Sequence, residues 1–144
     1  MTVVINKVAT HEGIEKCLEI RRHVFIIGQK VPVNEEIDGK DNDSIHYLLS
    51  INEKPAGTAR VRIITDYAKI ERVAILDEYQ GTGLGYKIMS FIITDLKLNP
   101  KVAQLKLSSQ THAIAFYKKL GFSVCSEEYM DANIPHKDMY MLAR

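Results

Sequence analysis

The sequence predicts one α/β domain with a mixed sheet, spanning residues 1–144. Segments with the two-residue alternation of strands and segments with the three- to four-residue spacing of helices follow one another in the order β-α-β-β-β-α-β-α-β-β. A chain of 144 residues is long enough to bury one hydrophobic core and has the usual size of a single domain.

The first part of the chain predicts a strand, a helix and a loop. Residues 3–8 favour a strand, and Thr10 is a suitable N-cap for the helix that follows. That helix runs to about Gly28, and one of its faces is formed by Ile14, Cys17, Leu18, Arg21, Val24 and Phe25. Residues 29–43 lose this periodicity and predict a long acidic loop, with a short helix inside it left open. Its five acids are Glu35, Glu36, Asp38, Asp41 and Asp43.

The middle of the chain predicts three antiparallel strands. Residues 45–51, 56–64 and 68–75 carry apolar or β-branched side chains, and short turns at residues 52–55 and 66–67 separate them. In the second of these strands, Arg60 and Arg62 lie on one face and Val61 and Ile63 on the other.

The remaining segments predict two helices and three strands. A helix begins near Gly83 and ends at Asn99-Pro100, because the residue before a proline disfavours helical geometry. Residues 102–108 form the next strand, and Gly121 closes a short helix. Residues 122–126 and 137–142 form the last pair of strands.

A glycine-rich stretch joins the third strand of the middle group to the long helix. Its residues are Gln80-Gly81-Thr82-Gly83-Leu84-Gly85. Glycines allow tight bends and close approach, and the free N–H groups of a helix N-terminus attract phosphate. The stretch therefore predicts a cradle for a pyrophosphate, although a simple helix cap remains an alternative.

Two common nucleotide-binding motifs fit this stretch poorly. A Rossmann fingerprint requires G-x-G-x-x-G, whereas these glycines are spaced G-x-G-x-G. A P-loop requires Lys followed by Ser or Thr, and Tyr86-Lys87 does not supply that pair. A nucleotide-binding protein is therefore a weak alternative.

Composition argues against several classes of partner. Lys and Arg total 19 and Asp and Glu total 18, so the net charge of +1 gives no general attraction to nucleic acid or to acidic membranes. No apolar run approaches the length of a membrane span, and the N-terminus has no signal-peptide pattern, so we expect a cytoplasmic protein. Cys17 and Cys125 lie far apart and are expected to be reduced; neither they nor the five histidines have metal-ligand spacing, so no metal is expected.

Two separated motifs resemble those of the Gcn5-related N-acetyltransferase (GNAT) family. The glycine-rich stretch is similar to the family loop Q/R-x-x-G-x-G/A, and Ala113-x-x-Phe116-Tyr117-x-x-x-Gly121-Phe122 is similar to the segment after the family's fifth strand. Other segments resemble those of the ElaA-like branch of this family. They are Arg21-Arg22-His23-Val24-Phe25, Gln29-Lys30-Val31-Pro32, Glu36-Ile37-Asp38 and Tyr129-x5-Pro135-His136. Gly28 departs from that branch, which often has an acid at this position.

The resemblance implies a GNAT-like fold and acetyl-CoA as co-substrate. The implied fold is a mixed, mostly antiparallel central sheet flanked by helices, with splayed fourth and fifth strands. The coenzyme would pair with the main chain of the fourth strand and rest its diphosphate on the glycine-rich loop. The implied cofactor-binding residues are Val73, Ala74, Ile75, Gln80, Gly81, Thr82, Gly83, Leu84, Gly85, Gln110, Ala113 and Phe116.

The resemblance also implies two catalytic side chains. Tyr117 matches the tyrosine that gives a proton to the coenzyme sulfur, and Glu71 lies on the strand where many members carry a general base. The amide of Val73 is a candidate donor to the oxyanion. The alternatives are a tyrosine that only packs in the core and a glutamate that pairs with Arg60 or Arg62.

The acceptor side is expected to involve the acidic loop and the C-terminal segment. Glu36, Asp38 and His136 are the candidate substrate-binding residues, against the alternatives of a solvated acidic run and a structural histidine. His112 would contact either the coenzyme or solvent.

We therefore expect an acetyl-CoA-dependent N-acetyltransferase that moves an acetyl group to a primary amine by direct attack in a ternary complex. The acceptor would be a small-molecule or peptide amine, with no nucleic-acid or membrane partner, and a homodimer is left open. The alternative is a catalytically silent acyl-CoA-binding or sensing domain, which would keep the glycine-rich loop and would not need Glu71 or Tyr117.

Overall fold

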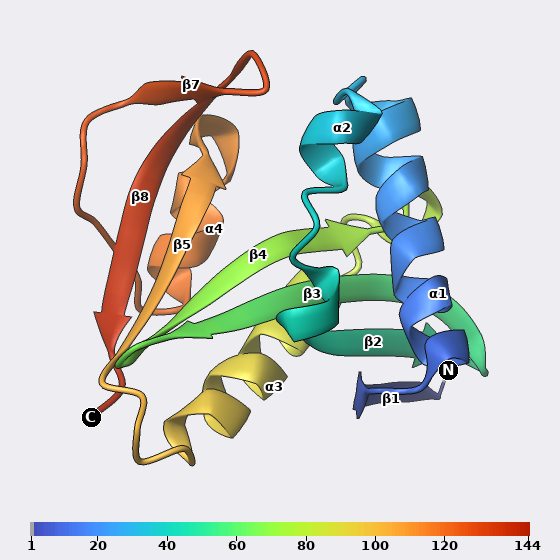
Figure 1. The fold of residues 1–144 in the computed structure, drawn as a ribbon, viewed down its shortest axis with the longest axis horizontal. Helices are drawn as coiled ribbons and strands as arrows, with labels where there is room; N and C mark the ends of the chain where they lie inside the picture. The colour runs from blue at the N-terminus through green and yellow to red at the C-terminus, as the bar shows by residue number, and fades with distance from the viewer. Residues whose placement is uncertain (1) are drawn as a thin grey trace.

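The computed structural model describes residues 2–144, which form an eight-stranded sheet with helices on both faces (Figure 1). The strands run in the spatial order β1-β2-β3-β4-β5-β8-β6, and β7 pairs with β8. They are β1 (Val3–Val8), β2 (Ile45–Ile51), β3 (Lys54–Ile64), β4 (Tyr67–Ile75), β5 (Gln104–Gln110), β6 (Ser123–Val124), β7 (Tyr129–Asp131) and β8 (Ile134–Leu142). All paired strands are antiparallel except β4 and β5, which confirms the predicted mixed, mostly antiparallel sheet.

The helices cover both faces of the sheet. Helix α1 (His11–Arg21) and the short α2 (Val33–Glu36) cover what we call the α1 face, whereas α3 (Leu84–Lys97) and α4 (Ile114–Lys119) cover the α3 face (Figure 1). A π-helical turn (Arg22–Gly28) continues α1, and 3₁₀ turns lie at Asp41–Asp43, Asp77–Tyr79 and Thr111–Ala113. No helix within residues 2–144 is long and apolar enough to cross a membrane.

The side chains of β2 point alternately to the two faces of the sheet and so contribute to two hydrophobic cores. Tyr47 and Leu49 are buried in the main core with α3, while Leu48 is buried in a smaller cluster with Cys17 and Ile20 of α1. The periodic face of α3 is buried as predicted, and it consists of Leu84, Ile88, Met89, Ile92, Ile93 and Leu96. The Tyr47 hydroxyl donates to Asp95 Oδ2 of α3 at 2.6 Å, which ties the helix to the sheet.

Strands β4 and β5 separate after four paired residues. Their register runs from Tyr67 opposite Gln104 to Ile70 opposite Leu107, and the rest of β4 has no partner on β5. A bulge accompanies the separation, because the β3–β4 register shifts between Thr58 and Arg60 and Arg72 adopts a left-handed φ of 55°. The expected splaying of the fourth and fifth strands is thus confirmed, and it opens a gap between the two halves of the sheet.

One segment agrees with an expectation that was left open, and another differs from the expected elements. The loop of residues 29–43 contains a short helix, α2, together with a 3₁₀ turn. The chain between residues 122 and 142 holds three strands rather than two, because Ala132 and Asn133 both adopt positive φ and form the tight turn of the β7–β8 hairpin. A two-residue turn without glycine gives a weak sequence signal, so this hairpin was missed.

Candidate active site

The glycine-rich loop lies between the end of β4 and the start of α3. Gly81 and Gly83 have φ of 76° and 82°, and a Cβ at either position would meet no atom within 4 Å. Gly83 is the N-cap of α3, so the first N–H groups of a 14-residue helix are available next to an open main-chain surface. This geometry suits a diphosphate, because helix N-termini stabilise anions and the glycines leave room for close approach.

The other residues of the loop support its shape. Gln80 donates its side-chain amide to Ile75 O at 3.0 Å and to Asp77 Oδ1 at 3.1 Å, and the Thr82 hydroxyl bonds to Tyr79 O. Leu84 is buried in the main core. The polar side chains of the loop therefore support the local backbone, and the main chain of the loop remains available to a ligand.

Gly85 of α3 lies beside Phe116 of α4, with space for an ordinary contact between the two helices. A Cβ at this position would lie 3.4 Å from Cζ of Phe116. The next residue of α4, Tyr117, packs edge-on against Phe116 and Phe122, with ring centroids 5.0 and 6.1 Å away. Burial raises the pKa of Tyr117 to about 12, so its hydroxyl stays protonated and able to donate at neutral pH.

The unpaired edge of β4 is followed by the 3₁₀ turn Asp77–Tyr79 and then by the glycine-rich loop. On its other edge, Ala74 and Ile75 remain paired with Thr58 and Gly57 of β3. Val73 and Ile75 also pack against the main core, so the strand is held firmly while its edge toward β5 is free within residues 2–144. The predicted coenzyme residues on β4, the glycine-rich loop and α4 thus lie around one end of the gap.

On the α1 face, four arginines and four carboxylates form one network of ion pairs. Arg21 of α1 binds Glu36 through contacts of 3.0–3.2 Å and Asp41 at 2.7 Å. Arg72 of β4 binds Glu36 at 2.8 Å and Asp38 at 3.3 Å. Arg21 and Glu36 are only 1% and 3% exposed, so these contacts fasten α2 to α1 and to the bulge of β4 from inside the protein.

The same network reaches β3 through Arg60 and Arg62. Arg60, which is 1% exposed, contacts Asp38 at 2.9 Å, Asp41 at 3.0 Å and also Glu71. Arg62 binds the other oxygen of Glu71 at 2.5–3.0 Å. Burial alone would raise the pKa of Glu71, but hydrogen bonds from Arg62 and Arg60 outweigh this effect and lower it. Hydrogen bonds from Arg60 likewise lower the pKa of Asp38 far below its usual range.

These contacts change the interpretation of three predicted site residues. Both oxygens of Glu71 are engaged by guanidinium groups and its pKa is lowered, so this carboxylate is poorly suited to take a proton from an amine. Glu36 and Asp38 neutralise arginines and leave no free charge for a cationic acceptor. Sequence spacing could not reveal this, because Glu36 and Arg72 are 36 residues apart.

A polar cluster on β5, β7 and β8 lies on the opposite side of the gap. Tyr129 donates its hydroxyl to Asp138 Oδ1 at 2.5 Å and also bonds to Ser108. Burial, followed by the Asp138 hydrogen bond, raises the pKa of Tyr129 to about 12. His136 stacks on the Tyr129 ring with centroids 6.1 Å apart. Ser108 and Asp138 were not singled out from the sequence, because their relation appears only when β5 pairs with β8.

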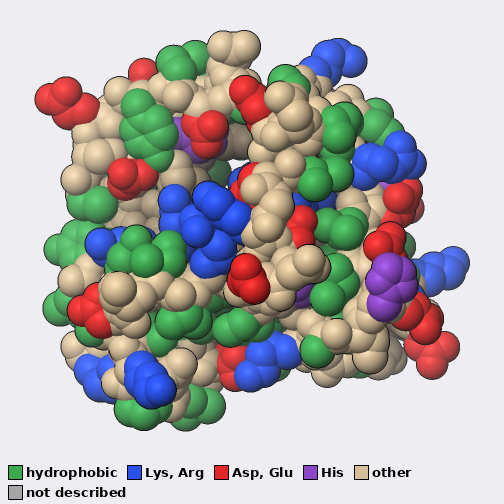
Figure 2. Space-filling view, in the orientation of Figure 1, with side chains coloured by type: hydrophobic (Ala, Val, Ile, Leu, Met, Phe, Trp, Pro, Cys, Tyr) green, Lys and Arg blue, Asp and Glu red, His purple; other side chains and the backbone are tan. Residues whose placement is uncertain are grey.

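Gln110, which was predicted to bind the coenzyme, reaches across the gap to Gln29. Its amide exchanges two hydrogen bonds with the side chain of Gln29, at 2.9 and 3.3 Å, and its Oε1 also contacts His112 Nε2 at 2.7 Å. Figure 2 shows a hollow between the half of the molecule that carries β5 and β8 and the segment around α2, with Lys and Arg side chains gathered next to it. The gap therefore has an opening on the α1 face.

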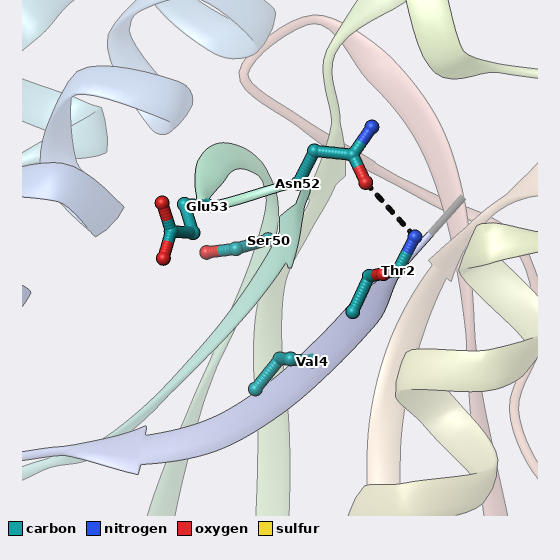
Figure 3. Close-up of a pocket in the computed structure, with 5 residues that line it drawn as sticks. All are labelled: Thr2, Val4, Ser50, Asn52 and Glu53. Atoms are coloured by element: carbon teal, nitrogen blue, oxygen red, sulfur yellow. Dashed lines mark hydrogen bonds between the residues drawn. The ribbon is translucent and has the colours of Figure 1, made fainter.

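Another open hollow lies at the far edge of the sheet (Figure 3). It is lined by Thr2, Val4, Ser50, Asn52 and Glu53, and the Thr2 N–H donates to Asn52 Oδ1 at 2.9 Å. Because β1 and β5 are separated by three strands, this hollow is remote from the gap. Among the described residues that line it, Glu53 is the one charged side chain, and they form no constellation suited to acyl transfer.

Comparisons with known proteins agree with this geometry. The model of the acetyltransferase (GNAT) domain family matches residues 8–143. The uncharacterized N-acetyltransferase YjcF of Bacillus subtilis (strain 168) is 37% identical over 140 residues, covering 96% of this chain and 98% of that protein. Protein ElaA of Escherichia coli (strain K12) is 29% identical over 127 residues, covering 85% and 82% of the two chains.

Solved structures share the fold over almost the whole chain. The crystal structure of Escherichia coli ElaA superposes with a TM-score of 0.87 at 24% identity, covering 96% of this chain and 99% of that chain. An acyl-CoA N-acyltransferase from Pseudomonas aeruginosa superposes with a TM-score of 0.85 at 25% identity, covering 96% and 97%. The chain therefore belongs to the GNAT acetyltransferase family, as an ElaA-like member.

Proposed function

We propose that this protein transfers the acetyl group of acetyl-CoA to a primary amine by direct attack within a ternary complex. The observation that carries the proposal is the separation of β4 from β5, which leaves one edge of β4 without a strand partner beside a hollow on the α1 face (Figure 2). Such a gap would let a coenzyme and an acceptor enter from opposite sides and meet at the thioester. Both substrates can then be bound together, which makes attack effectively intramolecular.

The coenzyme would lie along the unpaired edge of β4. Its pantetheine arm would pair with the main chain of Val73 and Ile75, with Ala74 between them, as a strand is added to an open sheet edge. Its diphosphate would rest on the amides of residues 81–85, and Ala113 and Phe116 would border it from the segment after β5. The thioester would then lie near the bulge at Arg72.

The chemistry needs an oxyanion donor and a proton for the leaving sulfur. The Val73 amide lies on the splayed part of β4 and is our candidate donor to the tetrahedral oxyanion. The Tyr117 hydroxyl is our candidate acid, because it is protonated at neutral pH and lies on the coenzyme side of the sheet. As the C–N bond forms and the C–S bond breaks, Tyr117 would protonate the thiolate and recover a proton from the amine nitrogen.

A coenzyme A release screen tests this function against a silent acyl-CoA-binding or sensing domain. Purified protein is mixed with acetyl-CoA and with small amines, amino sugars, peptides with free N-termini, or lysine side chains, and free thiol is measured. We expect thiol release that depends on one amine class and yields the matching acetamide. Calorimetric binding of acetyl-CoA without amine-dependent thiol release would support the silent domain instead.

A further inference from the structure

An amine acceptor must lose a proton before it can attack the thioester. Alkyl amines are protonated at neutral pH, since their pKa is about 10.4, and an ammonium has no lone pair for attack. A proton acceptor is therefore needed on the α1 face, where the acceptor enters. Glu71 is held by Arg60 and Arg62 with a lowered pKa, so another group is required.

His136 lies on the acceptor side of the gap. It pairs with Gln110 in the β5–β8 ladder, three residues beyond Leu107, the last residue of β5 that pairs with β4. Directly paired residues point to the same face of a sheet, so His136 shares its face with Gln110. The side chain of Gln110 reaches Gln29, in the segment after the π-helical turn, which places both residues at the opening on the α1 face.

The hydrogen bond of the imidazole fixes which nitrogen can accept a proton. His136 Nδ1 lies 2.6 Å from the carbonyl oxygen of Ile134. A carbonyl oxygen only accepts, so Nδ1 carries the hydrogen and Nε2 keeps its lone pair. Stacking on Tyr129, at 19° between ring planes, holds the ring in place, and the residue is only 9% exposed. Within residues 2–144, Nε2 has no hydrogen-bond partner, yet it is not sealed in the interior.

We propose that His136 Nε2 is the general base that deprotonates the acceptor ammonium. The proposal rests on the proposed N-acetyltransferase function. The ammonium gives one proton to Nε2, and the freed lone pair forms the C–N bond at the acetyl carbonyl. When the C–S bond breaks, Tyr117 protonates the sulfur and takes the second proton from nitrogen. The proton on Nε2 passes to solvent, so each turnover yields acetamide, free thiol and one proton.

The groups around His136 are compatible with this role. On its own side of the gap, Tyr129 has a raised pKa and remains neutral, while Asp138 accepts the Tyr129 hydroxyl. His112 contacts Gln110 and is exposed. Across the gap, the carboxylates Glu36 and Asp38 are paired with arginines. Among these facing groups, His136 alone combines an oriented ring with an unpartnered acceptor nitrogen in the part of the chain that the structure describes.

The test compares His136→Asn with the matched surface control His11→Asn, whose side chain is 92% exposed on α1. Asparagine places an N–H donor where Nδ1 stands and removes Nε2, so it keeps the bond to Ile134. Single-turnover acetylation of the fastest alkyl amine from the release screen is measured from pH 6.5 to 9.5. At pH 7 we expect a loss of about 10²–10⁴-fold in the variant. The loss should shrink about tenfold per pH unit above pH 8, because the amine then loses its proton to water.

Three results would overturn the proposal. They are a rate within about twofold of wild type at pH 7, a loss that stays constant with pH, and imidazole ¹⁵N spectra that show the hydrogen of neutral His136 on Nε2. A constant loss would mark a positioning role. His136→Gln is measured as a second variant in case His136→Asn does not fold. Failure of the proposed function is distinct, because wild type would then bind acetyl-CoA and acetylate no amine.

Discussion

Gln29 and Gln110 join the two sides of the opening on the α1 face by a reciprocal pair of amide hydrogen bonds. The distances are 2.9 Å from Gln110 Nε2 to Gln29 Oε1 and 3.3 Å from Gln29 Nε2 to Gln110 Oε1. The two residues are 81 positions apart in the sequence. One follows the π-helical turn and the other ends β5, where β5 has already separated from β4. The pair therefore fixes the width of the opening, and it engages an amide that the family resemblance assigned to the coenzyme.

Removal of this amide pair should weaken acceptor binding more than coenzyme binding. We expect Gln29→Ala and Gln110→Ala each to raise KM for the amine with little change in the Kd of acetyl-CoA. Since the side chains are in direct contact, a double-mutant cycle should show a coupling of about 0.5–3 kcal/mol. The prediction is contradicted if Gln110→Ala raises the Kd of acetyl-CoA while Gln29→Ala leaves it unchanged, since Gln110 would then be a coenzyme ligand.

Loss of Arg60 should destabilise the fold strongly. The side chain is 1% exposed and contacts Asp38, Asp41 and Glu71, so Arg60→Met removes one guanidinium partner from each of three partly or fully buried carboxylates. We expect the free energy of unfolding in urea to fall by about 3–5 kcal/mol. Arg22→Met is the control, because the Arg22–Glu19 pair is solvent-exposed and its loss should leave the urea midpoint unchanged. Equal midpoints for Arg60→Met and wild type would refute a structural role of the network.

The same network makes stability sensitive to acid. The pKa values of Asp38 and Glu71 in the folded protein are lowered from ordinary values of 3.8 and 4.5, so the unfolded chain binds more protons as the pH falls. The free energy of unfolding should thus be complete above about pH 5 and decline below about pH 4. Urea titrations from pH 7 to 2.5 measure this slope, and Glu71→Gln should flatten it. Exposed Glu53→Gln serves as control; an unchanged slope in Glu71→Gln would contradict the assignment.

Gly83→Asp should abolish acetyl-CoA binding. The substitution places a carboxylate beside the proposed diphosphate site, where electrostatic repulsion opposes binding. Gly39→Asp is a close control, since Gly39 has φ of 78° against 82° at Gly83 and a Cβ at either position meets nothing within 4 Å. The backbone cost is therefore similar, and only Gly83→Asp should lose the calorimetric signal. Unchanged affinity in a folded Gly83→Asp protein would refute the cradle.

Local sequence patterns predicted the elements that depend on local chemistry. The periodic face of α3, the alternation of β2 and the glycine-rich turn were all visible, because burial and backbone freedom act on neighbouring residues. The resemblance added the splayed strands. The partners of Glu36 and Glu71 could be identified only from the three-dimensional structure, since charge pairing depends on which side chains the fold brings together. Glu71 illustrates the limit: the pairing with Arg60 or Arg62 was a stated alternative, and sequence alone could not choose it.

The π-helical turn after α1 shows the same limit on a smaller scale. Helical periodicity predicted one helix ending near Gly28, and the end is at that residue. The hydrogen-bond pattern changes at Arg22, however, and Gln29 N bonds to Val24 O in the wider spacing. After this change in hydrogen bonding, the side chain of Gln29 contacts Gln110. The residue types in the segment do not predict the π-helical turn.

The most direct test of the account is a rapid-quench single turnover with labelled acetyl-CoA, excess protein and the amine found in the release screen, for wild type and Tyr117→Phe. The phenylalanine keeps the packing against Phe116 and Phe122 and removes only the proton donor. We predict that acetamide and free thiol appear together in wild type, without label on the protein, and that Tyr117→Phe slows this step about 10²–10⁴-fold at unchanged acetyl-CoA affinity. Protein-bound label, or a Tyr117→Phe rate equal to that of wild type, would contradict direct transfer with Tyr117 as the acid.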